Sequence, residues 1–465
     1  MSSTLGADIA PVVSKSRTLT FTSIGHFMND GMVFFVPVVA DILAKNHRTS
    51  PMLVTAILTV FYVASAAIGL VVGRMADRIG KRGLLVSLGI FILSLGLLIF
   101  YLSLTVPAGV TSDTLAIIAA VMAGIGSSFY HPLGGSIIQL IFDIKSRGKA
   151  LGINGAFGSL GRALYPSLFF IVAALAISKT NTVMIFAVLG ILVAAAIAYG
   201  IGRLPNTHAS PARIPDAASA DSPDTANPAD TVITTNQAAT TPTITSQGAL
   251  HSADTSTNPT DQVNPRSIKS IFTKSVIVLT IISFMRSMAF IGIVSWVPIY
   301  LTTQKHLGVS SQLGYTMTIM FAGGILGQPF FGQMADRFDK RIILALNSVG
   351  SALSIFAYIS FSGAGSIVSL VFFGFFTFSS FPLLMSMVSD YVPRESFTTG
   401  NAIVWGLGST GGQALGPLVV GLLTFGSYSH LGTAFIVMAI VAIITVLGTP
   451  LMKKVDSRTK MAIFG

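Results

Sequence analysis

The chain contains 465 residues, of which 52% are hydrophobic and only 10% are charged. A soluble protein carries about 25% charged residues, so this composition excludes a soluble enzyme of this length. The formal net charge of +11 does not indicate nucleic-acid binding, because the basic residues are scattered between apolar stretches. The absence of cysteine excludes disulfides, iron–sulfur clusters and cysteine zinc sites. The high hydrophobic fraction and the low charged fraction together indicate a membrane protein.

Twelve apolar segments are long enough to cross a membrane, since about 20 helical residues span its hydrocarbon core. In chain order we expect helices at 19–44, 52–72, 83–105, 114–142, 149–177, 182–202, 275–302, 311–331, 342–362, 366–392, 399–425 and 431–452. The predicted fold is an all-α membrane protein with twelve transmembrane helices.

A polar segment divides these helices six and six. Residues 204–266 contain no Phe, Tyr or Trp, so they cannot bury enough apolar area to offset their ordering entropy. We expect a disordered linker there, because no amphipathic period supports the alternative of a small extramembrane domain. The predicted organisation is a tail at 1–18, a six-helix bundle at 19–203, the linker at 204–266, a second six-helix bundle at 267–452 and a tail at 453–465.

Lys and Arg residues are distributed unequally between the two sides of the membrane. If the N-terminus is cytoplasmic, the loops on the outer side carry few basic residues, namely Lys45, Arg48, Lys179 and Lys305. Cytoplasmic loops carry the excess of such residues in membrane proteins. We therefore expect both termini and the linker in the cytoplasm. The expected location is the plasma membrane, and the expected state is a monomer.

A loop motif occurs at corresponding places in the two halves. Residues 73–82 read GRMADRIGKR, and residues 332–341 read GQMADRFDKR, with Asp339 in place of the second glycine. We expect the first glycine to let two helix ends approach, and the Asp to form charge-assisted hydrogen bonds that hold one gate state. The alternative, that the loops only set topology, does not explain the repeated Asp. The residues assigned to this gate are Gly73, Asp77, Arg78, Gly80, Arg82, Gly332, Asp336, Arg337 and Arg341.

An acidic and a basic residue follow both the fourth and the tenth segments. Asp143 and Arg147 close the fourth, and Asp390 and Arg394 close the tenth. We expect these residues to pair with the repeated loops across a closed cytoplasmic side. The alternative is that they are wet helix ends, where such pairs contribute under about 1 kcal/mol.

The repeated loop motif resembles the signature of the major facilitator superfamily, and the resemblance covers the chain outside the linker and tails. It implies two six-helix bundles that rock around a central cavity, lined by the first, fourth, seventh and tenth segments. A chain of this kind is a secondary transporter that works by alternating access.

Asp30 is the one carboxylate deep within an expected span, and His26 precedes it by four residues. This spacing places both side chains on one helix face, where an imidazole and a carboxylate can share or pass a proton. Ionisable groups at this depth are costly, so function is the default hypothesis. We expect Asp30 and His26 to form the proton-coupling site, and the alternative is an Asp held permanently by helix contacts.

Residues 25–30 (GHFMND) and 124–132 (GIGSSFYHP) resemble the fosmidomycin-resistance branch of the superfamily, as does Trp296 with its neighbours. The resemblance places Asn29, Tyr130, His131 and Trp296 near the substrate. Some members have an acidic residue soon after the His-Pro pair, where this chain has Leu-Gly-Gly. The alternative for His131 is a packing or hydrogen-bonding role.

Arg162 and Arg286 are the basic residues within expected spans, and each needs a partner: Asp30, a helix-end carbonyl or an anionic substrate. The resemblance places Arg286 at the cavity, where we expect it to bind substrate rather than to pair with Asp30. Arg162 is a further substrate candidate, with packing support as its alternative. Phe381 matches His131 in the second half and belongs to an aromatic stretch that forms either a cavity wall or a lipid-facing surface.

We expect a proton gradient to drive transport without a cofactor, because the sequence contains no nucleotide-binding P-loop. The favoured function is export of a small polar or anionic compound, such as a drug, in exchange for protons. The alternatives are a proton-coupled importer of an organic anion such as a carboxylate, and a channel or receptor on the same scaffold. No nucleophile–base pair or cluster of metal ligands occurs at usable spacing, so we expect neither an enzyme nor a metal site.

Overall fold

A computed structural model describes residues 14–142, 144–175, 178–202, 204, 271–392 and 400–455 of the chain. Nearly all of the expected linker and most of both expected tails lie outside the described residues. Every regular element within the described ranges is a helix. The all-helical expectation is therefore confirmed.

The described residues of the N-terminal half form seven helices. They are α1 (Lys15–His47), α2 (Pro51–Ile79), α3 (Arg82–Thr105), α4 (Val110–Ser127), α5 (Tyr130–Ile141), α6 (Ile144–Ala174) and α7 (Lys179–Ile201). Contacts of α3 with α4 and α7, and of α1 with α6, hold them together as one bundle.

The C-terminal half repeats this order with more interruptions. Its elements are α9 (Lys274–Thr303), α10 (Ser311–Arg337), α11 (Lys340–Ser360), α12 (Gly363–Thr377), α13 (Ser380–Tyr391), the π-helix η2 (Ala402–Thr410), α15 (Gly411–Leu422), the 3₁₀-helix η3 (Tyr428–His430), α16 (Leu431–Ile444) and the 3₁₀-helix η4 (Thr445–Leu451). All twelve expected segments are thus helical. Among the described residues, nine segments are long and apolar enough to cross a membrane on their own.

Short polar residues define several helix ends. The Ser50 hydroxyl accepts the backbone N–H of Leu53 at the start of α2, and Ser178 and Thr273 cap α7 and α9 in the same way. Gly80 ends α2 with φ at 70°, a left-handed conformation that favours glycine. In the second copy of the loop, Asp339 has φ at −61° and caps the start of α11. The two copies therefore differ in sequence because their loops turn differently.

The fourth and tenth expected segments are both interrupted in the middle. The first break separates α4 from α5 just before Pro132, and the second separates α12 from α13 just before Pro382. Proline removes a backbone donor and crowds the preceding turn, which explains why each helix breaks there. The first break brings Tyr130 and His131 to the start of α5.

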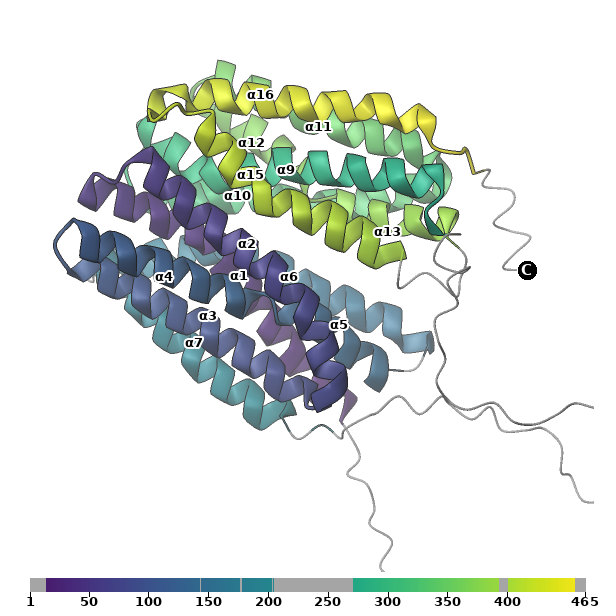
Figure 1. The fold of residues 1–465 in the computed structure, drawn as a ribbon, viewed down its shortest axis with the longest axis horizontal. Coiled ribbons are helices and arrows are strands. Elements are labelled where there is room, and N and C mark those ends of the chain that lie inside the picture. Colours follow the sequence, from purple (N-terminus) through teal and green to yellow (C-terminus); the bar gives the residue numbers. More distant parts are fainter. Residues whose placement is uncertain are drawn as a thin grey trace, which may run out of the picture.

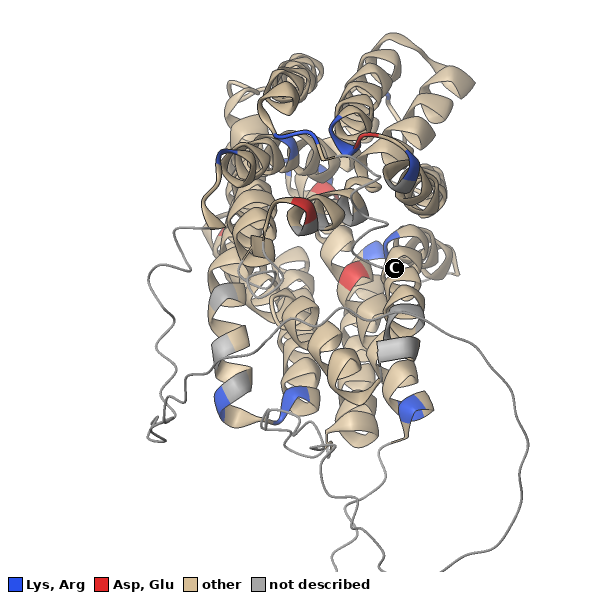
Figure 2. Ribbon diagram, turned by 90° about the vertical axis from the view of Figure 1, so that its right-hand side faces the viewer, with Lys and Arg blue, Asp and Glu red and all other residues tan. Residues whose placement is uncertain are grey.

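The two bundles lie against each other, with the purple-to-teal N-terminal half beside the green-to-yellow C-terminal half (Figure 1). We call the end opposite the start of α1 and the end of η4 the distal end (Figure 1); it comprises residues 43–51, 106–110, 302–311, 361–363 and 423–430. Charged residues are sparse along the helices (Figure 2). This arrangement leaves mostly apolar helix surface to face a membrane, as an all-α membrane fold requires.

Side-chain hydrogen bonds join the two bundles in the distal half. Ser295 donates to the Tyr62 hydroxyl at 3.3 Å, and the Ser167 and Thr318 hydroxyls lie 2.6 Å apart. Tyr428 donates to the carbonyl of Thr49 at 2.8 Å. The bundles are therefore tied together at and near the distal end.

Candidate functional site

A cluster of polar side chains surrounds Asp30 in the middle of α1. The Asp30 side chain is only 2% exposed, and Arg162 of α6 donates to its Oδ2 atom. The Nε2 atom of His131 lies 3.3 Å from Oδ1, and the Nε2 atom of His26 lies 3.5 Å from Oδ2. We call His26, Asp30, His131 and Arg162 the Asp30 cluster. Its four members come from three helices, α1, α5 and α6. The fold therefore brings His131 and Arg162 to the pair that His26 and Asp30 form on α1.

A backbone carbonyl indicates which ring nitrogen of His26 carries a hydrogen. Its Nδ1 atom lies 2.8 Å from the carbonyl oxygen of Asn154, which can only accept. Nδ1 therefore carries a hydrogen, and in a neutral ring Nε2 presents its lone pair towards Asp30. A proton placed between Nε2 and the carboxylate would satisfy both atoms.

Tyr130 and Asn154 support the His26 ring. The rings of Tyr130 and His26 are stacked at 4.6 Å, the Tyr130 hydroxyl donates to the Thr22 carbonyl at 2.7 Å, and the Asn154 amide donates to the Tyr130 hydroxyl at 2.8 Å. Tyr130 is buried, so it positions His26 rather than facing open space. Asn154 was missed in the sequence because a single amide in a glycine-rich helix carries no distinguishing pattern.

The exposure of the Asp30 cluster is one-sided. His131 is 60% exposed, whereas Arg162 is 18% and His26 14% exposed. The only member that is open to the surroundings is therefore the imidazole next to Oδ1.

Arg162 lies where the two bundles meet. Its guanidinium carbon is 5.7 Å from the ring centre of Phe34 and 5.9 Å from that of Phe378, which belongs to the opposite bundle. The rings of Phe34, Phe321 and Phe378 contact one another at 5.1–6.0 Å. An aromatic surface from the C-terminal half thus faces the cluster, although the side chain of Phe381 lies outside the described residues.

Arg286 is placed differently from the expectation that it faces the cavity. It is 3% exposed and lies inside the C-terminal bundle. There its guanidinium donates hydrogen bonds to the Oδ1 atom of the Asn347 side chain and, at 3.1 Å, to the Ser348 hydroxyl. Its guanidinium carbon is 4.9 Å from the ring centre of Phe290. In this conformation Arg286 neither pairs with Asp30 nor faces an open cavity. Its hydrogen-bond partners are polar side chains of α11.

Two other expected substrate residues are buried. The Trp296 indole donates to the carbonyl of Pro417 at 3.1 Å and is fully enclosed between α9 and α15. Asn29 donates to Asp30 Oδ1 at 3.1 Å, and its own side-chain oxygen has no hydrogen-bond partner among the described residues. In this conformation Trp296 packs two helices together, and Asn29 supports Asp30.

The structure describes contacts of two expected gate residues, Arg341 and Asp390, in the second half. Asp339 and Arg341 form an ion pair of 2.7 Å, and Lys340 pairs with Asp390 at the same distance. The pKa of Asp339 is lowered, chiefly by hydrogen bonds from the Arg341 side chain. Asp390 therefore does contact the repeated loop, within its own bundle.

The first glycine of each loop copy lies in open surroundings. A Cβ atom added to Gly73 or Gly332 would meet no atom within 4 Å, so neither glycine lies at a close helix approach here. Arg78 and Arg337 are exposed, and Arg82 lies at the first position of α3. The side chains of Asp77, Arg147 and Asp336, and all of Asp143 and Arg394, lie outside the described residues.

The Asp30 cluster also contains a possible set of cation ligands. One atom from each of His26, Asp30 and His131 lies within 4.8 Å of the others. The guanidinium of Arg162 already occupies Asp30 Oδ2, which opposes a second fixed charge there. The arrangement therefore suits a proton better than a metal ion.

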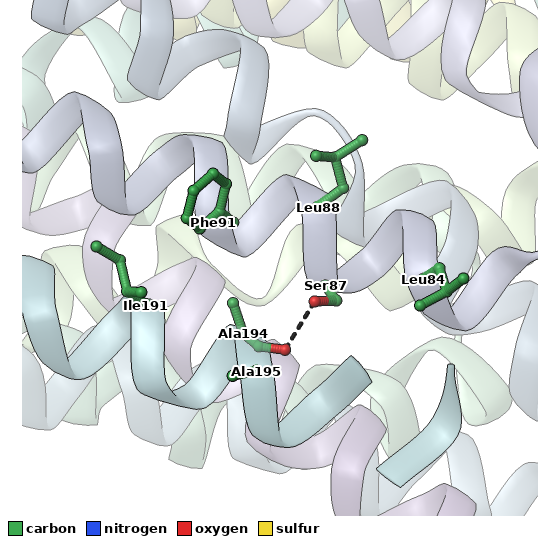
Figure 3. Close-up of a pocket in the computed structure, with 7 residues that line it drawn as sticks. All are labelled: Leu84, Ser87, Leu88, Phe91, Ile191, Ala194 and Ala195. Carbon is green, nitrogen blue, oxygen red and sulfur yellow. Dashed lines mark hydrogen bonds between the residues drawn. The ribbon is translucent and has the colours of Figure 1, made fainter. Parts of the chain in front are cut away.

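A shallow apolar pocket lies elsewhere, between α3 and α7. Figure 3 shows its lining, in which the Ser87 hydroxyl donates to the Ala194 carbonyl at 2.7 Å. Its other side chains are aliphatic or aromatic: Leu84, Leu88, Phe91, Ile191 and Ala195. With its one hydroxyl already bonded, this pocket offers no group that would select a polar substrate.

Comparisons with known proteins agree on one family. The family model described as Major Facilitator Superfamily matches residues 19–404 and 304–462. A putative metabolite transport protein of Haemophilus influenzae is 26% identical over 37% of this chain and 41% of its own length. A cis,cis-muconate transport protein of Acinetobacter baylyi is 25% identical over 32% of this chain and 35% of its own length. Each match thus covers less than half of the relative.

A solved structure shares the whole fold. The bacterial homologue of the human lysosomal transporter Spinster, in an inward-facing and occupied conformation, is 13% identical with a TM-score of 0.69. The likeness covers 95% of this chain and 97% of that one. It supports the arrangement of the helices and carries no information on the substrate.

Proposed function

Because this chain belongs to the major facilitator superfamily, we propose that it is a proton-coupled transporter of a small organic anion. Asp30 is the proposed proton site, and Arg162 is the proposed anion site. The observation that carries this proposal is the ion pair between them at the meeting of the two bundles. His131, which is exposed beside the pair, provides the route by which both ligands reach it.

The ion pair links proton binding to anion binding. When Asp30 is ionised, it neutralises Arg162, and an anionic substrate has to compete with it. When Asp30 takes up a proton, the guanidinium loses its partner and becomes available to the substrate. Each ligand then favours the binding of the other, which is the thermodynamic requirement for symport.

The neighbouring groups fit this cycle. His26 is held by Asn154 with its lone pair towards Asp30, so it can pass or share the proton. Phe34 and Phe378 flank Arg162 from opposite bundles, and a planar conjugated anion bound to the guanidinium would contact these rings. The name of the cis,cis-muconate relative supports a carboxylate as the substrate class.

Export of drugs by proton exchange is the second candidate. It is supported by the resemblance of residues 25–30 and 124–132 to the fosmidomycin-resistance branch. The exported compound would be small and polar or anionic, and exchange requires that its binding competes with that of the proton. Location in the plasma membrane, cytoplasmic termini and a monomeric state stay predictions under either candidate.

The test uses purified protein in lipid vesicles with radiolabelled cis,cis-muconate and other small carboxylates as probes. We expect accumulation only when the outside is acidic relative to the inside. Asp30→Asn should lose accumulation but keep exchange of labelled for unlabelled substrate, because its Arg162 stays free. Asp113→Asn, an acidic residue in the first turn of α4, is the matched control and should behave like the parent.

Accumulation driven by the opposite gradient would overturn symport and favour export. That outcome predicts protection from fosmidomycin in a pump-deficient bacterial host, whereas import predicts heightened sensitivity or no change. Full activity of Asp30→Asn under a gradient would overturn both and favour a channel.

A further inference from the structure

A second carboxylate is buried where the bundles meet at the distal end. Asp41, eleven residues after Asp30 on α1, has an exposure of 0%. Its Oδ1 atom accepts a hydrogen bond of 2.6 Å from the Thr302 hydroxyl of α9, in the opposite bundle. Its Oδ2 atom is buried and has no hydrogen-bond partner among the described residues. Sequence reasoning passed over Asp41 because it lies near a helix end, where water usually reaches a charged group.

No cation neutralises this carboxylate directly. Lys45, one turn further along α1, donates instead to the backbone carbonyl of Thr302 at 3.3 Å. Lys179 at the start of α7 is near enough to act on Asp41 electrostatically, but its side chain is exposed. Tyr428 is the remaining titratable neighbour, and its hydroxyl is engaged with Thr49. Among the described residues, none lies within ion-pair distance of Asp41.

An ionised carboxylate in this position would be poorly compensated. One hydrogen bond from a neutral hydroxyl does not offset the removal of a charge from water, and the second oxygen has no donor at all. The neutral acid avoids that cost. Separation of the bundles at the distal end would break the Thr302 bond and admit water, and the ionised form would then be favoured.

We propose that Asp41 is a second proton-binding site, which holds a proton while the distal ends are packed together and releases it when they separate. The site is distinct from the Asp30 cluster, and the proposal depends neither on the substrate nor on Asp30. By linkage, a state that binds a proton more tightly is favoured at low pH. Acidic conditions should therefore keep the distal end closed, and alkaline conditions should open it.

The absence of cysteine makes the distal end accessible to site-specific labels. Ala108→Cys, in the loop between α3 and α4, and Ser362→Cys, between α11 and α12, are exposed positions on opposite bundles at this end. Spin labels at both positions, in lipid nanodiscs, would report the distance between the bundles by double electron–electron resonance. No substrate is added, so the measurement does not depend on transport.

We expect a short-distance population at pH 5.5 that gives way to a longer one as the pH rises to 8.5. For a single proton, the ratio of the two populations changes by at most about tenfold per pH unit. Asp41→Asn, which mimics the neutral acid, should hold the short distance at every pH. Thr302→Val, which removes the hydrogen bond, should increase the longer population at every pH.

A matched control separates this site from other carboxylates: Asp113→Asn should keep the parent's pH response. No transport step enters the measurement, so a failure of the proton-coupled transport proposal leaves this result intact. A pH response unchanged in Asp41→Asn, or no response in the parent, would overturn the inference. If Asp41→Asn does not fold, Thr302→Val still tests the inference. A distance distribution identical to the parent's would show that the hydrogen bond between Thr302 and Asp41 does not control closure of the distal end.

Discussion

Each half of the molecule buries an arginine among its helices, and the two arginines have different partners. Arg162 in the N-terminal half pairs with a carboxylate, Asp30, beside an exposed imidazole at the meeting of the bundles. Arg286 in the C-terminal half lies deep inside its bundle and binds the neutral side chains of Asn347 and Ser348.

This difference determines what each charge can do. Under the proposed function, a proton displaces Arg162 from Asp30, so the N-terminal pair changes its charge during a cycle. The partners of Arg286 are neutral and offer no such switch. We therefore expect the N-terminal half to titrate and the buried charge of the C-terminal half to support structure.

Substituting the two arginines tests this comparison and should give the largest effects. Arg162→Gln removes the proposed anion site, and we expect transport of cis,cis-muconate to fall about 100-fold, equivalent to roughly 2.7 kcal/mol. Arg286→Gln leaves buried polar groups of α11 without a charged donor, so we expect folding stability to fall by about 2 kcal/mol with transport per folded molecule nearly unchanged. Vesicle uptake and thermal unfolding in detergent measure the two effects.

Each arginine variant serves as the control for the other, since both replace a buried guanidinium by the same amide. The opposite pattern, with transport lost and stability kept in Arg286→Gln, would contradict the comparison. It would mean that Arg286 contacts the substrate in another conformation, as the resemblance of the seventh segment implied.

The sequence predicted the helices and the titratable core of the site. Twelve apolar segments had to be helical, because a membrane leaves backbone groups no other partner within a single segment. Asp30, His26 and His131 were identifiable because each is an ionisable group in an apolar stretch. The three side chains lie close together in the fold, as expected because ionisable groups inside a membrane usually pair with one another.

The partners of those groups could not be predicted. Which arginine meets Asp30 depends on how α1 packs against α6, and residues 132 positions apart in the chain leave no local pattern for that choice. Asn154 and Thr302 are ordinary polar residues whose roles arise only from packing. Asp41 was passed over because its burial is created by contact between the bundles.

The two copies of the loop motif also differ in backbone shape, and glycine substitutions should show it with a smaller effect. Gly80 has φ at 70°, so Gly80→Ala should cost about 1 kcal/mol of stability. Gly73→Ala is the matched control, because it adds a methyl group in open space within α2 and should stabilise the helix by roughly 0.5 kcal/mol. Thermal unfolding measures both.

Transport adds a second result to the same pair of variants. A loss of transport in Gly73→Ala with intact stability would show that the glycine is needed for a close approach in another conformation. Equal stability of Gly80→Ala and the parent would contradict the requirement for a left-handed residue at the end of α2.

The smallest expected effect comes from Asp339, which replaces that glycine in the second copy. Hydrogen bonds from Arg341 lower the pKa of Asp339 below its ordinary value. The ionised form therefore stabilises the fold above the unfolded-state pKa of about 3.9, and this contribution is lost as the pH falls through the lower folded-state pKa.

Asp339→Asn should reduce the free energy of unfolding at pH 7 by a few tenths of a kcal/mol, which is about the value of a partly exposed ion pair. The difference from the parent should shrink below about pH 4, and thermal unfolding at pH 7, 5 and 3 measures it. A constant difference at all three pH values would contradict the ion-pair explanation, because an Asn side chain can still accept the Arg341 backbone N–H and the variant therefore keeps the helix cap.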